Sequence, residues 1–241
     1  MEKTVANELE SINVSREDLY SFLARVFLVE VDNEFLTTIN AIQPTIESLV
    51  TEQDGTELKK TSMSLTEFSR KATELPSDDR AKLLSDLAAE YASLFLAAGQ
   101  LGGRRIVIPF ESAYFTTPPR MFGDQYHEVV DAFKSVGYEK PKNFLDPEDH
   151  IAPELDFMAH MSEQIRLCIK EEKYDYAIGY LKLQKEFLRE HLLRWVGKLC
   201  SAILQVAQSE FYRSIATLTN CFVTMDEHII DHMMDAIEAQ R

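Results

Sequence analysis

The chain has 241 residues, of which 45% are hydrophobic and 27% charged, a composition typical of globular proteins. Its 25 basic and 40 acidic side chains give a formal net charge of -15, which repels polyanions, so we expect no nucleic-acid partner. No apolar run approaches the roughly 18 residues of a membrane helix, and the first residues lack the apolar core of an export signal, so we expect a cytoplasmic protein.

The spacing of apolar residues predicts an all-α fold. Only 8 Gly and 8 Pro interrupt the chain, and the long segments between them repeat with a period near 3.6 residues. We expect a single helical domain over residues 1–241, with about nine to eleven helices. An irregular connection over 138–149 divides them into two groups, about 14–137 and 150–239.

In the first group, Ser15 and Asp18 resemble a capping box and predict the start of the first helix. A second helix is expected from near Asp32 to about Leu49, and a third over 57–75. The next is expected from Ser77, the candidate N-cap residue, to Gly99, and its apolar residues form one broad stripe. These residues are Leu83, Leu84, Leu87, Tyr91, Leu94 and Phe95.

In the second half of the chain, Pro119 is expected to begin a helix that Gly137 ends. Because Ala152 precedes a proline, we expect the following helix to open with Pro153 at its first position. Further helices are predicted over about 154–172, 174–206, 209–223 and 226–239. The core candidates in them are Leu188, Leu192, Trp195 and Leu199.

Two sequence features suggest chemistry only weakly. The Gly and Arg residues at 102–105 favour anions but lack the order of a phosphate-binding loop, which favours a plain surface loop. His228 and His232 share a helical face, yet spacing indicates no third metal ligand. We therefore assign no catalytic residue, no metal ligand and no cofactor.

The segment 146–158 is more informative, because it places five carboxylates within eleven residues beside His150. They are Asp146, Glu148, Asp149, Glu154 and Asp156. Acidic residues also gather near helix N-termini because the helix dipole favours them there, and this explanation stays open. An enzyme that uses His150 with these carboxylates is a second alternative.

The run P-E-D-H-x-x-x-E-L-x-F-M at 147–158 resembles the signature of the TorD/DmsD/NarJ-type redox-enzyme maturation chaperones. The Y-x-x-L-F element at 91–95 and the P-F-E-S-x-Y element at 109–114 also resemble family elements, in the same order. So do F-L-R-E-H-L-L-R-W at 187–195 and F-Y-R-S-I-A-T-L-T at 211–219. Phe110 departs from the tyrosine that is common in the family.

The resemblance implies an all-helical cytoplasmic chaperone rather than an enzyme. Its expected partners are the twin-arginine signal peptide and the apo form of a molybdoenzyme catalytic subunit, whose export it delays until the cofactor is inserted. The family's peptide-binding region corresponds to Asp149, His150 and Glu154, and to Tyr91, Glu111 and Tyr114. Core packing is the competing interpretation for Tyr91, as it is for His191 and Trp195.

Two further expectations concern assembly. An adaptor or assembly subunit without a peptide pocket is the alternative function that composition alone does not separate from a chaperone. Some relatives exchange helical segments to form dimers, and the 138–149 connection is the candidate hinge for such a homodimer.

Overall fold

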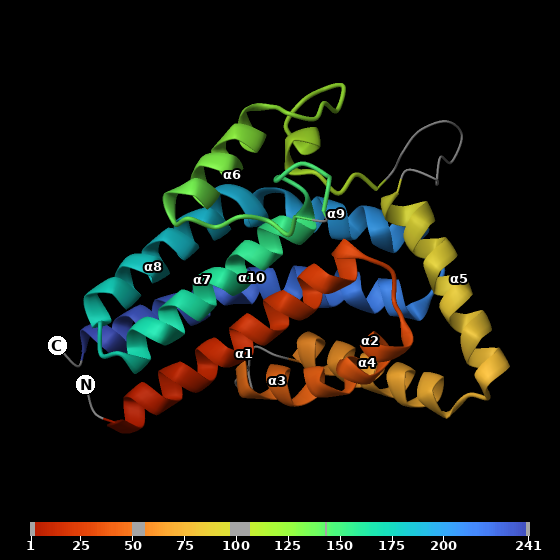
Figure 1. The fold of residues 1–241 in the computed structure, drawn as a ribbon, viewed down its shortest axis with the longest axis horizontal. Coiled ribbons are helices and arrows are strands. Elements are labelled where there is room, and N and C mark those ends of the chain that lie inside the picture. Colours follow the sequence, from red (N-terminus) through yellow and green to blue (C-terminus); the bar gives the residue numbers. More distant parts are fainter. Residues whose placement is uncertain (1–2, 50–55, 97–106, 143, 240–241) are drawn as a thin grey trace. The chain divides into compact units, whose positions relative to one another are not determined.

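Helices make up the regular structure of the protein. The computed structural model describes residues 3–49, 56–96, 107–142 and 144–239, and within these ranges it contains no β-strand, which confirms the all-α prediction (Figure 1). The α-helices are α1 (Lys3–Leu28), α2 (Asn33–Thr38), α3 (Ile42–Leu49), α4 (Thr56–Glu74), α5 (Ser77–Phe95), α6 (Asp124–Ser135), α7 (Ile151–Lys170), α8 (Tyr174–Phe187), α9 (Leu193–Val206) and α10 (Glu210–Glu238). Short 3-10 helices cover Ile39–Ala41 and Glu111–Tyr114, and a π-helix covers Leu188–Leu192.

The chain divides into two compact units. The first comprises Met1–Ala24, Phe110–Trp195 and Val223–Arg241, and the second comprises Arg25–Pro109 and Val196–Phe222. Three of the four boundaries fall inside α1, α9 and α10, and the fourth lies between Pro109 and Phe110. The single-domain organisation and the segment-exchanged homodimer stay predictions.

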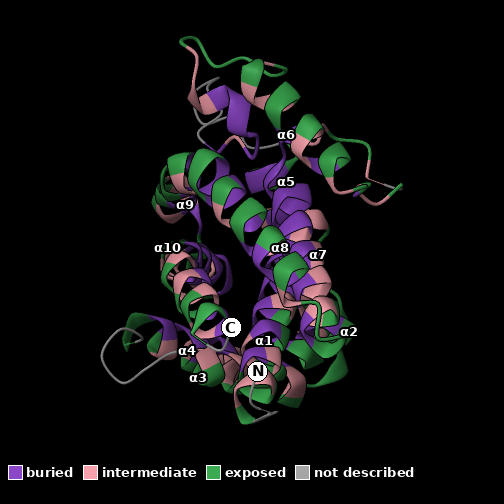
Figure 2. Ribbon diagram, turned by 90° about the vertical axis from the view of Figure 1, so that its left-hand side faces the viewer, coloured by how far each residue is buried: buried purple, intermediate pink, exposed green. Residues whose placement is uncertain are grey.

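Buried aromatic side chains form the centre of the first unit. The helices α7 and α8 lie side by side in Figure 1, and buried and exposed positions alternate along α8 in Figure 2 as an amphipathic helix requires, whereas α7 is mostly buried. The rings of Phe133, Phe157 and Phe187 contact one another, with 4.8 Å between the centroids of the first two and 4.6 Å between those of the last two. Tyr138 packs on Phe157 and donates a hydrogen bond to Asp156, which fixes the start of the irregular connection to α7.

A buried ion pair also holds the first unit together. Arg16 on α1 donates from Nε to Oδ1 of Asp226 on α10 at 2.6 Å, and neither side chain has exposed surface. Tyr20 donates to the same carboxylate at 2.7 Å, and Gln184 accepts a bond from Arg16. Burying two charges is costly unless each is paired and hydrogen-bonded, and this network meets that condition.

The second unit contains α2 to α5 and parts of α1, α9 and α10. Its core includes the predicted stripe of α5, of which Leu87, Tyr91, Leu94 and Phe95 are buried and Leu83 and Leu84 half-buried. Asp32 caps α2 through a bond from the Phe35 backbone NH at 2.7 Å, so the helix begins close to the expected residue. Of the predicted core residues, Leu188, Leu192 and Trp195 in the first unit and Leu199 in the second are fully buried.

Several predicted helix boundaries are wrong. The first helix begins at Lys3 rather than at Ser15, and one helix, α10, replaces the two expected over 209–223 and 226–239. In both cases a buried polar residue extends the helix: Asn13 in α1 and Asp226 in α10 are fully buried. Hydrophobic periodicity does not register such positions, because they resemble surface residues in the sequence.

Some helix ends that were predicted from proline and glycine residues are also wrong. The helix α7 begins at Ile151, with Pro153 inside its first turn, where the missing NH has no helical partner to lose. The helix expected from Pro119 begins at Asp124, after Gly123 at the N-cap position. The N-cap residue of α5 is Pro76, and Ser77 is the first residue of that helix. That helix ends at Phe95, and the predicted end at Gly99 and the Gly-Arg cluster at 102–105 lie outside the described residues.

Candidate functional site

The short helix Glu111–Tyr114 is tied to the residues that precede α7. The backbone NH of Glu111 donates to the carbonyl of Asp149 at 2.8 Å, and the NH of Ser112 donates to Oδ2 of Asp149 at 3.0 Å. Phe110 and His150 form an isolated antiparallel bridge beside these bonds. Backbone pairing therefore holds together two segments that are far apart in the sequence and places Glu111 and Asp149 in one site.

His150 is the N-cap residue of α7. Its Nδ1 accepts a hydrogen bond from the backbone NH of Ala152 at 3.1 Å, and its ring packs edge-on against Phe110 and Phe144 at centroid distances of 5.1 and 4.9 Å. An imidazole whose Nδ1 accepts in this way carries no proton on that atom. His150 therefore orients the start of α7 and is only 3% exposed.

Glu154 lies in the first turn of α7 and has no exposed surface. Its Oε2 accepts a hydrogen bond from the indole Nε1 of Trp195 at 3.2 Å, and the ring of Tyr114 lies on the same indole at a centroid distance of 5.4 Å. Glu111 is equally buried, and its Oε2 lies 2.9 Å from Nδ1 of His191. Two residues of the sequence element at 187–195 thus contact the predicted site. They are His191 and Trp195, for which core packing was the competing interpretation.

Burial raises the pKa of each of the three carboxyl groups of this cluster, Glu111, Asp149 and Glu154. The negative charges of Glu111 and Asp149 raise the pKa of Glu154 further, whereas the hydrogen bond from His191 opposes the effect at Glu111. One oxygen of each carboxylate is buried without a hydrogen-bond partner among the described residues: Glu111 Oε1, Asp149 Oδ1 and Glu154 Oε1. Unsatisfied buried acceptors of this kind are rare in folded proteins and mark this cluster as unusual.

The structure thus brings together five of the six predicted site residues, namely Glu111, Tyr114, Asp149, His150 and Glu154. Tyr91 belongs to the second unit, where its hydroxyl donates to the carbonyl of Phe27 at 3.0 Å and its ring packs on Phe95. Sequence reasoning did not predict the pairing of His191 with Glu111. The signal that could have indicated it is the single histidine one turn before Trp195 in an otherwise apolar face.

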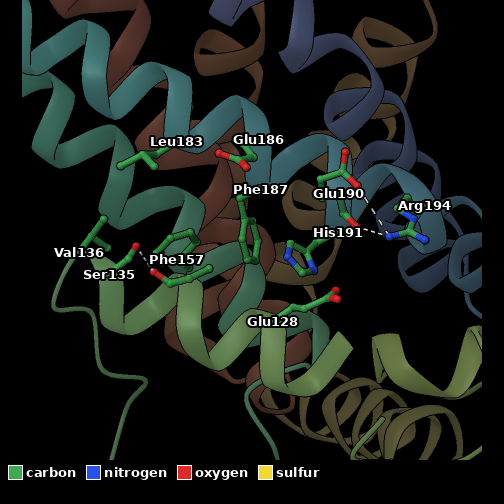
Figure 3. A pocket seen from close by; sticks show the side chains of 11 residues that line it. Glu128, Ser135, Val136, Phe157, Leu183, Glu186, Phe187, Glu190, His191 and Arg194 are labelled. Carbon is green, nitrogen blue, oxygen red and sulfur yellow. Dashed lines mark hydrogen bonds and ion pairs between the residues drawn. The ribbon is translucent and has the colours of Figure 1, made fainter. Parts of the chain in front are cut away.

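His191 also lines a pocket on the first unit. The pocket has a volume of about 430 Å³, and α6, α7, α8, the π-helix and the first turn of α9 contribute to it (Figure 3). Phe157, Phe187 and His191 are its buried residues, whereas the charged side chains at its rim are exposed. The charged residues are Glu128, Glu186, Glu190 and Arg194, and the remaining lining residues are Ala132, Ser135, Val136 and Leu183.

The arrangement of these side chains suits the binding of a ligand, and it offers little for catalysis. The buried carboxylates are closed off from the surface in this conformation, and the exposed pocket combines aromatic surface with negative charge. Within the described ranges, no group of three His, Cys, Asp or Glu side chains has the arrangement of a metal site, and His228 and His232 are exposed on α10. None of the helices in these ranges is long and apolar enough to cross a membrane.

Comparison with known proteins identifies relatives along nearly the whole chain. A family model described as "Nitrate reductase delta subunit" matches residues 52–201, more than half of the chain. The protein named "Chaperone protein TorD" from Vibrio cholerae serotype O1 is 24% identical over 230 residues, which cover 94% of this chain and 97% of the relative. Proteins of the same name from Shewanella piezotolerans and Vibrio parahaemolyticus are 25% and 26% identical, and the alignments cover 92% and 91% of this chain and 94% and 96% of theirs.

Proposed function

The chain belongs to the nitrate reductase delta subunit family of TorD-like maturation chaperones, and from this premise we propose that it binds the twin-arginine signal peptide of a molybdopterin oxidoreductase precursor. In this proposal the protein acts in the cytoplasm, delays export of the precursor and assists its maturation while the cofactor is inserted. It is a chaperone and not an enzyme, so its function consists of binding its client protein.

One observation carries the proposal: the motif carboxylates adjoin a pocket that is both acidic and aromatic. A twin-arginine signal peptide joins an arginine pair to an apolar stretch, so its receptor needs negative charge beside apolar surface. The first unit offers this combination, because His191 contacts Glu111 in the buried cluster and Phe187 in the pocket.

We assign different roles to the predicted site residues. Glu111, Asp149, His150, Glu154 and Tyr114 form the inner wall of the binding region and position the helices around it, since their side chains are mostly buried. A peptide contacts the exposed pocket rather than these carboxylates in the conformation described. A contribution of Tyr91, which lies in the second unit, stays a prediction.

Recovery of the chain with its bound proteins from its own cells tests the proposed client. Mass spectrometry should identify a molybdoenzyme precursor that retains its signal peptide, in about equimolar amount. Recovery of only the mature, cofactor-loaded enzyme would instead support an adaptor or assembly subunit and would contradict the proposal.

A further inference from the structure

The rim of the pocket carries unbalanced negative charge. Glu128 on α6 and Glu186 on α8 are exposed and form no ion pair among the described residues. The one basic side chain of the rim, Arg194, is already engaged: its Nη1 donates to the carbonyl of Glu190 at 3.1 Å, and its guanidinium lies 4.5 Å from the ring centroid of Phe115. The rim therefore attracts a cation, and none of the described residues that line it supplies a free one.

The buried side of the pocket is aromatic. Phe157 and Phe187 are 2% and 3% exposed, and His191 stacks on Phe187 with 4.6 Å between the ring centroids (Figure 3). Aromatic faces attract cations and also bind the methylene groups of long basic side chains. The half-buried Ala132 and Val136 and the partly exposed Leu183 add apolar wall. This combination discriminates against both acidic and small polar side chains.

His191 connects this surface to the buried cluster. It is largely buried, and the hydrogen bond that the structure gives it uses Nδ1, toward Glu111. The residue lies in the π-helix Leu188–Leu192, and single π-turns inside helices are frequent at functional sites. The volume of about 430 Å³ falls within the roughly 300 to 1,000 Å³ that is usual for ligand pockets.

We propose that this pocket binds one arginine side chain of a client peptide, with its guanidinium between Glu128 and Glu186 and its stem on Phe157 and Phe187. The inference rests on the proposed function and says where on the first unit the peptide's arginine binds. Arginine is favoured over lysine because its planar, weakly hydrated guanidinium stacks on aromatic rings and pairs with carboxylates through several donors. The pocket is thereby an arginine subsite, separate from the buried carboxylates of the sequence motif.

The test measures the affinity of a fluorescent peptide with two arginines followed by an apolar stretch. The variant carrying Glu128→Gln and Glu186→Gln should bind about three- to thirty-fold more weakly, as expected for the loss of two partly exposed ion pairs. The matched control carries Asp131→Asn and Glu163→Gln, which remove two exposed or half-exposed carboxylates of α6 and α7 outside the pocket. The control should bind as the parent does.

Photo-crosslinking tests independently where on the protein the peptide binds. A photoreactive phenylalanine at Leu183, which lines the pocket and is 43% exposed, should crosslink to the peptide next to its arginines. The same group at Leu167, which is 38% exposed on α7 outside the pocket, should not.

The outcomes separate the two proposals. If the parent binds the peptide but the Glu128→Gln, Glu186→Gln variant binds equally well and Leu183 gives no crosslink, the arginine subsite is wrong while the proposed function stands. If the parent itself fails to bind any such peptide, the proposed function fails. Equal weakening in the control variant would mean that general surface charge, and not this pocket, attracts the peptide.

Discussion

The imidazole of His191 and the carboxylate of Glu111 lie 2.9 Å apart inside the first unit and link a surface pocket to a buried acidic cluster. The two residues are 80 positions apart in the chain. Because Glu111 is also bound to Asp149 through its backbone, movement of His191 by a ligand would act on the start of α7. In the proposed function, the motif residues support the binding surface rather than form it.

Glu154→Gln should stabilise the protein at pH 8. Burial raises the pKa of Glu154 above its unfolded value of about 4.3, so the folded state holds a proton more tightly than the unfolded state. The resulting stabilisation is full below the unfolded pKa and is lost as pH rises through the folded pKa, about 1.4 kcal/mol for each unit of difference. The neutral amide avoids that loss, and its oxygen can still accept from Trp195.

Urea unfolding between pH 5 and pH 8 checks this prediction. The advantage of Glu154→Gln over the parent should shrink as pH falls toward 5. The control Glu163→Gln, on the same helix but with a partly exposed side chain, should stay within about 0.5 kcal/mol of the parent. An advantage that is absent or independent of pH would mean that Glu154 is not held in a strongly desolvated state.

His191→Ala should destabilise the first unit by about 1 to 3 kcal/mol, because it leaves a second oxygen of the buried Glu111 without a partner. The same substitution in a Glu111→Gln background should cost less, since the charge that needs His191 is gone. A double-mutant cycle by thermal unfolding should give an interaction energy of about 0.5 kcal/mol or more. Additive effects would show that the pair contributes nothing to stability.

Asp226→Asn should destabilise the protein by about 3 to 5 kcal/mol. It removes the charge that compensates Arg16, and both side chains have no exposed surface. Asp235→Asn on the same helix is the control, because Asp235 is exposed, and it should change stability by less than about 0.5 kcal/mol. A mild effect of Asp226→Asn, equal to that of the control, would contradict the role of the ion pair in joining α1 to α10.

Replacing both exposed histidines of α10, His228→Ala with His232→Ala, should leave the melting temperature and peptide binding nearly unchanged. Surface substitutions outside a network usually cost less than about 0.5 kcal/mol. Thermal melts with and without added zinc provide the measurement. A large loss of stability, or stabilisation of the parent by zinc, would indicate a metal site instead.

Apolar periodicity predicted the helices wherever the buried face is apolar. The stripe of α5 and the helix α4 are examples, whereas the single helix expected from near Asp32 to about Leu49 is divided into α2, a 3-10 turn and α3. The prediction was wrong where a polar residue is buried, as at Asn13 and Asp226, because the partner that makes burial favourable lies far away in the chain. Arg16 and Asp226 are 210 positions apart, and spacing within one helix carries no information about such a pair.

For the site, the motif resemblance identified carboxylates that the fold does bring together. It could not show that Glu111, Asp149 and Glu154 are fully buried, since acidic residues near a helix N-terminus ordinarily face solvent. The pocket could not be predicted from the sequence either, because its walls come from α6, α7, α8, the π-helix and α9, and no local pattern indicates that Glu128 and Glu186 line the same pocket.

Titration calorimetry of the chain with a twin-arginine signal peptide tests the central claim most directly. At low salt we expect binding with one peptide per chain. The affinity should fall as salt rises, because screening shortens the reach of charge from about 10 Å at 0.1 M salt to about 3 Å at 1 M. A peptide with both arginines replaced by glutamine should bind much more weakly. Equal affinity for the two peptides, or no binding of either at low salt, would contradict the account.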